Sequence, residues 1–122
     1  MLRYAMLASA LLLTTAPATA QQIPTEIGQC VKTTISELGT RLEGVADSGD
    51  IVGYPGDLYG ISYGVVDGLK GSRVGDKVKL CLVSLPGDCP PGDDRGKVYS
   101  GFNPRTGLSW ELPDAGHMCG GA

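Results

Sequence analysis

Glycine is the residue that most limits what this chain can fold into. All 19 glycines, and seven of the eight prolines, lie after residue 20. Glycine disfavours a regular helix because its backbone has much freedom to lose, and proline lacks the amide hydrogen that a helix needs. The composition therefore predicts a mainly β domain in which short strands are joined by turns.

Residues 1–20 have the pattern of a secretory signal peptide. Arg3 precedes an apolar run over residues 5–13, and residues 18–20 form a small-x-small ending. The run is too short to span a bilayer, and such an ending is typical of a cleavage site. We therefore expect a single small β domain over residues 21–122, without a membrane span, in a periplasmic or secreted location.

The charge of the chain is mildly acidic and spread along the sequence. There are 13 acidic and 10 basic residues, which give a net charge of −3. Nucleic acids and anionic membrane surfaces are bound by clustered basic residues, and no such cluster is visible in the sequence. We therefore expect the partner to be a protein or another component of the cell envelope, and not a nucleic acid.

Four cysteines bear on how such a small domain is held together. An even number in an exported chain of this size is typical of disulfides. None has the Cys-x-x-Cys spacing of redox pairs and zinc ribbons, so we predict two disulfides and neither metal nor cofactor. The residues concerned are Cys30, Cys81, Cys89 and Cys119.

Three stretches alternate with the two-residue period of a half-buried strand: 58–65, 77–85 and 108–112. A weaker strand over 97–102 is predicted to form a hairpin with the last of these, because the five-residue connection between them suits a turn. The large residues that share a face are Tyr59, Ile61, Tyr63 and Val65 in the first stretch, Val78, Leu80 and Leu82 in the second, and Leu108, Trp110 and Leu112 in the third.

Residues 28–42 are ambiguous, because apolar residues recur there at helical spacing while glycines and β-branched residues disfavour a helix. We expect a long bent strand with a bulge at Gly39, and a short N-terminal helix is the alternative. About five strands in a meander suit a small closed or nearly closed barrel, SH3-like or OB-like.

The expected strand directions also bear on the disulfide pairing. If the last three strands run up, down and up, the loop that holds Cys89 and the tail that holds Cys119 emerge at the same end. This favours Cys89 with Cys119 and Cys30 with Cys81, although four cysteines allow three pairings.

Motifs for catalysis are mostly absent. Residues 91–97 lack the glycine spacing of a phosphate loop, and the aspartates of residues 47–57 lack the spacing of a calcium loop, so both segments are interpreted as turns. His117, the only histidine, lies in a glycine-rich tail and is interpreted as a polar residue beside the Cys119 disulfide. We predict no catalytic residue.

Candidate binding residues are aromatic side chains and one charged loop. Tyr54 and Tyr99 are the tyrosines expected to be exposed, and exposed tyrosines beside loops are typical of recognition surfaces. Asp93, Asp94 and Arg95 lie in the loop after Cys89. We predict a binding or interaction module of the cell envelope. The alternatives are an inhibitor of a hydrolase, which would use the loop 90–94, and a small envelope hydrolase that uses carboxylates.

Four segments, SRVGDKVKLCLVSLP, CPPGDDRGKVY, NPRTGLSW and HMCGGA, carry a resemblance. Together they resemble a group of small exported proteins of Gram-negative bacteria that have no assigned activity. The resemblance covers most of residues 21–122. It implies a cysteine-stabilised exported domain and carries over no catalytic residue.

Overall fold

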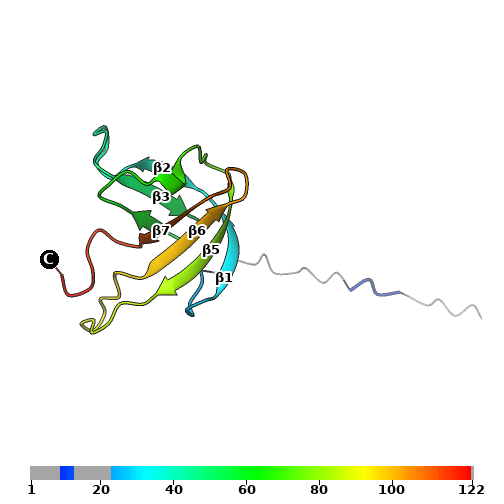
Figure 1. Ribbon diagram of the computed structural model, residues 1–122. Coiled ribbons are helices and arrows are strands. Elements are labelled where there is room, and N and C mark those ends of the chain that lie inside the picture. Colours follow the sequence, from blue (N-terminus) through cyan, green and yellow to red (C-terminus); the bar gives the residue numbers. More distant parts are fainter. Residues whose placement is uncertain (1–8, 13–22, 122) are drawn as a thin grey trace, which may run out of the picture.

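The computed structural model describes residues 9–12 and 23–121 (Figure 1). The predicted signal peptide, residues 1–20, lies outside this part of the chain apart from residues 9–12. Within 23–121 the protein is mainly β, with two antiparallel sheets and a single turn of 3-10 helix, η1 (Asp67–Leu69). The strands of the first sheet are, in order, β1 (Cys30–Thr34), β5 (Lys77–Ser84), β6 (Val98–Asn103) and β7 (Leu108–Pro113), and those of the second are β2 (Glu37–Thr40), β3 (Asp50–Tyr54) and β4 (Leu58–Ile61).

The strands β5 and β7 lie within one residue of the bounds that the alternation predicts, and β6 lies within one residue of the weaker strand predicted over 97–102. The hairpin between β6 and β7 is confirmed, and its turn is closed by the Gly107 N–H, which donates to the Asn103 carbonyl at 2.8 Å. Gly107 has a φ of 73°, which a residue with a side chain rarely adopts. Between β5 and β6 the loop of residues 85–97 has no regular structure, as its prolines and glycines indicate.

The segment 28–42 forms two strands that belong to different sheets. The Ile35 N–H donates to the carbonyl of Asp76, which directly precedes β5 of the first sheet, and the next N–H, of Ser36, donates to the Gly53 carbonyl of the second sheet. The chain therefore changes sheets between these two residues. Gly39 pairs with Ile51 inside a regular ladder, so the bulge predicted there is wrong, and the alternative of a short N-terminal helix is not formed in the described residues.

The described strands do not close into the five-stranded barrel that the sequence suggested. Their number is seven, because the first segment divides in two and β3 occupies residues that were interpreted as turns. Its apolar pair Ile51-Val52 is flanked by Asp50 and Gly53, so the segment shows no clear alternation. The two sheets instead pack face to face, with β4 against β7, and a methyl group at Gly60 would lie 3.1 Å from the Leu112 Cβ.

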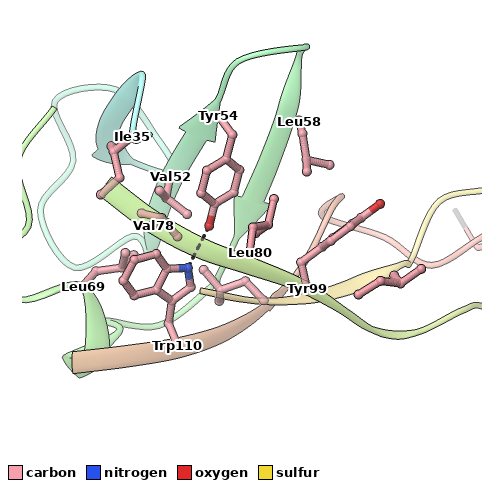
Figure 2. Close-up of a cluster of buried hydrophobic side chains, with 11 residues drawn as sticks. Ile35, Val52, Tyr54, Leu58, Leu69, Val78, Leu80, Tyr99 and Trp110 are labelled. Carbon is pink, nitrogen blue, oxygen red and sulfur yellow. Dashed lines mark hydrogen bonds between the residues drawn. The ribbon is translucent and has the colours of Figure 1, made fainter. Parts of the chain in front are cut away.

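The core lies between the two sheets (Figure 2). The predicted core face of β5 is confirmed, and so are Trp110 and Leu112 in β7, although Leu108 is exposed at the start of that strand. In β4 the buried face is that of Leu58 and Gly60, opposite to the face with the large residues. The buried apolar residues are Ile35, Val52, Tyr54, Leu58, Leu69, Val78, Leu80, Leu82, Tyr99, Trp110 and Leu112.

Gly60 explains why β4 turns its large residues outward. Its missing side chain lets the strand approach β7, where Leu112 fills the space between the sheets. The side chain of Tyr59 on the other face is 36% exposed, and Tyr63 and Val65 lie beyond the end of the strand and are exposed. The strand is therefore shorter than predicted, and Leu58 and Gly60 face the core.

Two disulfides are present, in the pairing that the strand directions favoured. Cys30 and Cys81 are directly opposite each other in β1 and β5, with their Cα atoms 4.1 Å apart. Cys89 and Cys119 join the loop after β5 to the C-terminal segment. In the described residues no helix is long and apolar enough to cross a membrane.

Candidate functional site

Tyr54 and Tyr99 were expected to be exposed, and this prediction is wrong. Their side chains are 4% and 5% exposed. Tyr54 ends β3 on the inner face of its sheet, where its hydroxyl oxygen accepts a hydrogen bond from Trp110 Nε1 at 2.8 Å (Figure 2). Burial raises the pKa of Tyr54 to about 12. Both tyrosines belong to the core, because the opposing sheet offers them apolar contacts and, for Tyr54, a hydrogen-bond donor.

The charged loop residues Asp93, Asp94 and Arg95 form ion pairs and hydrogen bonds within the loop and with the C-terminal segment. Arg95 donates two hydrogen bonds of 2.8 Å to the Asp93 carboxylate, which also accepts one from the Gly120 N–H. These contacts hold the pKa of the Asp93 carboxyl well below its usual range. Asp94 pairs with Lys97 at 3.1 Å. Asp93, Arg95 and the Cys89–Cys119 disulfide together hold the C-terminal segment in place. We call this set of contacts the tail clasp.

His117 lies beside this clasp and contacts an aromatic ring. Its ring centroid is 6.4 Å from that of Tyr63, and the Arg41 guanidinium lies 4.3 Å from the same Tyr63 ring centroid. Cys119 is bonded to Cys89, and the described residues hold no group of three side chains suited to a metal ion. The arrangement of His117 is therefore a surface contact with Tyr63.

Positively charged side chains are concentrated on a different surface, the outer face of the four-stranded sheet. Three of the five lysines lie there, Lys32 on β1 and Lys77 and Lys79 on β5. Lys32 is directly opposite Lys79, and Lys79 is directly opposite Phe102 on β6. We call these four residues the lysine face. Phe102 is 41% exposed, so an aromatic ring lies in the open beside the ammonium groups.

The lysine face is hollowed on both sides of Phe102. One hollow of about 570 Å³ is lined by all four residues of the face together with Pro104 and others of β1 and β5. A second, of about 540 Å³, lies toward β7 and is lined by Lys79, Phe102 and Glu111 among others. Both are open, so they suit an extended ligand better than an enclosed small molecule.

The lysines of this face form no ion pair within the described part of the chain. The ion pairs there join Arg95 with Asp93, Lys97 with Asp94, and Arg105 with Asp76. None of them includes a lysine of the lysine face. Like charges directly opposite on neighbouring strands destabilise a sheet, so the pairing of Lys32 with Lys79 carries a cost.

Sequence reasoning missed this surface because its residues are far apart in the chain. Strand pairing brings the CVKTT segment of β1 beside the KVKLC segment of β5, so a charge that is spread in sequence becomes clustered in space. The signal was the position of each lysine on the polar side of a predicted strand. Only the register of β1 against β5 could have shown that Lys32 and Lys79 meet.

The carboxylates with shifted pKa values do not resemble those of a hydrolase. Arg105 and Asn103 hold the pKa of the Asp76 carboxyl well below its usual range, as Arg95 does for Asp93. A general acid in glycoside hydrolysis needs a raised pKa, which keeps its proton available. Neither Asp76 nor Asp93 meets this requirement, and both are bound to an arginine of the same chain.

On the lysine face, lysines without ion pairs to the described residues, the exposed ring of Phe102 and two open hollows coincide. The resemblance to small exported bacterial proteins stays a prediction, as does the inhibitor interpretation of the loop 90–94. Comparisons with protein-family models, with curated proteins and with solved structures found no match to this chain.

Proposed function

We propose that this domain is an interaction module of the cell envelope that binds an anionic partner through the lysine face. The observation that carries the proposal is the direct opposition of Lys32 and Lys79 beside the exposed ring of Phe102. Ammonium groups attract an anion and orient it, and an exposed aromatic ring contributes apolar contact area. A partner with negative charge would offset the repulsion between the two lysines.

A purely structural reason accounts for part of the pattern. A lysine on an edge strand discourages pairing with other molecules, and Lys32 lies on such a strand. Lys79 lies on β5, which has a neighbour on each side and needs no such protection. Protection of the edge therefore explains one lysine of the pair and leaves the other without a structural reason.

The Cys30–Cys81 disulfide supports the proposal because it fixes the geometry of the face. It joins β1 to β5 on the same outer side, two positions from the Lys32 and Lys79 pair. The register that holds the lysines opposite each other is thus covalently set. A surface that is ordered before binding loses less conformational entropy on association, which favours recognition.

Heparin provides a polyanion probe for this proposal. Salt-gradient elution from a heparin column would compare the oxidised protein with the double variant Lys32→Gln/Lys79→Gln. The matched control is Lys70→Gln/Lys97→Gln, which removes the same charge from positions outside the lysine face. We expect Lys32→Gln/Lys79→Gln to bind heparin at least about tenfold more weakly than the unmodified protein, equivalent to ~1.4 kcal/mol.

The control variant should keep most of its heparin affinity, because its lysines do not converge on one surface. If the two double variants lose affinity equally, only net charge matters and the lysine face is not a site. The proposal also fails if the unmodified protein does not bind heparin at low salt. Circular dichroism of each variant would show that its sheet structure is kept.

A further inference from the structure

We infer that the partner is an extended acidic protein segment that adds as an antiparallel strand to the free edge of β1. The inference rests on the proposed function, because it uses the same lysine face, and it names the class of the partner. Strand addition to an exposed sheet edge is a general mode of peptide recognition, in which backbone hydrogen bonds supply much of the affinity.

The hydrogen bonds around β1 show which of its backbone groups are free. The Leu82 N–H donates to the Gln29 carbonyl at 3.1 Å, and the Ile35 N–H donates to the Asp76 carbonyl at 2.9 Å. Gln29 and Ile35 thus face the β5 side. In an antiparallel pair, successive residues point their N–H and C=O groups alternately toward the partner and away from it.

By this alternation Cys30, Lys32 and Thr34 point their backbone groups away from β5. β1 is the first strand of its sheet, so no strand of the described chain lies on that side. None of these three backbone N–H groups donates to a turn or loop of the described residues. The same three residues carry their side chains on the outer face. The free edge and the lysine face are therefore two sides of one surface.

A strand added here would place every second side chain next to the lysine face. A residue directly opposite Lys32 would share its face of the sheet, and Lys79 lies one strand further in. Carboxylates at these positions would pair with the ammonium groups. The intervening side chains would point to the other face, toward partly buried Val31, where apolar residues fit. The expected motif alternates acidic and apolar residues.

A second copy of this chain is a poorer occupant of the edge. The β1 segment CVKTT contains a lysine and no acid, so two antiparallel β1 strands would bring like charges together. The other edge strands of the two sheets, β2, β4 and β7, contain no lysine, and β2 carries Glu37. The edge of β1 is thus the one where free backbone groups coincide with lysines that form no ion pair in the described chain.

The inference can be tested by measuring the binding of fluorescently labelled heptapeptides. They have the alternating sequence EVEVEVE and blocked ends. In antiparallel addition the glutamates lie directly opposite Cys30, Lys32 and Thr34. The backbone N–H and C=O groups of each glutamate then form hydrogen bonds with the residue opposite. N-methylation of the glutamates should therefore abolish binding, and N-methylation of the valines should leave it within about twofold. Both modified peptides keep the charge, so a difference between them reports on backbone pairing.

The protein supplies a matched pair of variants. Thr34→Pro removes an outward N–H at the β1 edge and keeps all three lysines of the face. Thr40→Pro is its control on β2. Because the Arg41 N–H donates to the Gly49 carbonyl, Thr40 also faces away from its partner strand. Thr34→Pro should weaken binding of the unmodified peptide at least about tenfold, and Thr40→Pro should leave it unchanged.

Each outcome separates strand addition from the proposed function. Loss of binding on methylation of the glutamates and with Thr34→Pro, while heparin affinity is kept, supports the inference. Equal binding of all peptides overturns strand addition and leaves a charged surface. Failure of the unmodified peptide to bind, while heparin still binds, also overturns it. If neither heparin nor the peptide binds, the proposed function fails as well. Thermal melting would confirm that both proline variants are folded.

Discussion

The hydrogen bond between Tyr54 and Trp110 gives the sharpest prediction about stability. It joins the two sheets across the core, and the indole that donates it is only 5% exposed. Tyr54→Phe removes the acceptor and keeps the ring, so Trp110 Nε1–H is left without a partner in an apolar surrounding. An unsatisfied buried donor costs about 1–3 kcal/mol. We therefore expect the free energy of unfolding to fall by ~2 kcal/mol.

Urea unfolding followed by tryptophan fluorescence measures this loss directly, because Trp110 is the only tryptophan in the chain. The midpoint should fall while the slope of the transition stays constant, since the surface exposed on unfolding is nearly the same. For a domain of this size, ~2 kcal/mol corresponds to a fall in melting temperature of roughly 8–16 °C.

Tyr99→Phe is the matched control for this measurement. Tyr99 is buried to a similar degree, 5% exposed, but its hydroxyl has no hydrogen bond to the described residues. Its loss should be within about 0.5 kcal/mol, the usual range where no specific contact is removed. Equal losses for the two variants would show that the hydrogen bond of Tyr54 makes no specific contribution to stability, and so would an unchanged midpoint for Tyr54→Phe.

Two further predictions concern the same indole. The pKa of Tyr54 is about 12 in the folded state and 10.0 in the reference state. Its contribution to stability is complete below pH 10 and is lost as pH rises toward 12, because the unfolded chain releases the proton first. At about pH 11 the protein should lose ~1.4 kcal/mol more than Tyr54→Phe does, relative to about pH 8, by chemical denaturation at each pH. Gly101→Ala should lower the free energy of unfolding by about 1–3 kcal/mol, because the added methyl would lie 2.3 Å from the Trp110 ring. Gly39→Ala has open space and should stay within about 0.5 kcal/mol, and equal melting temperatures for the two variants would contradict the packing.

Local patterns in the sequence were enough for one half of the fold. The strands β5 and β7 alternate regularly, and the turn residues 103–107 mark the hairpin, so the position of Trp110 in the core followed from its neighbours. The strands and the hairpin depend on segments that are adjacent in the sequence. The disulfides join more distant segments, and the expected strand directions favoured the observed pairing among the three that four cysteines allow.

The remaining half depends on which sheet a residue faces, and this is not a local property. Tyr54 precedes a turn and looked exposed, but its hydroxyl meets Trp110 from the opposing sheet. The change of sheets at Ile35 is visible only because Asp76 directly precedes β5 of one sheet and Gly53 belongs to β3 of the other. The lysine face also needed a register between distant strands. Each of these features requires the tertiary arrangement before it can be seen.

The pairing of β1 with β5 has a consequence for how the molecule forms. The Cys30 and Cys81 positions are separated by 51 residues, whereas β2, β3 and β4, and likewise β6 and β7, follow each other closely in the chain. Closing a long loop costs more entropy before any contact is gained, so hairpins between neighbouring strands form earlier. The docking of β1 should be a late step in folding. Lys32 then meets Lys79 only in molecules that have completed this step, and the oxidation of Cys30 and Cys81 retains them in that state.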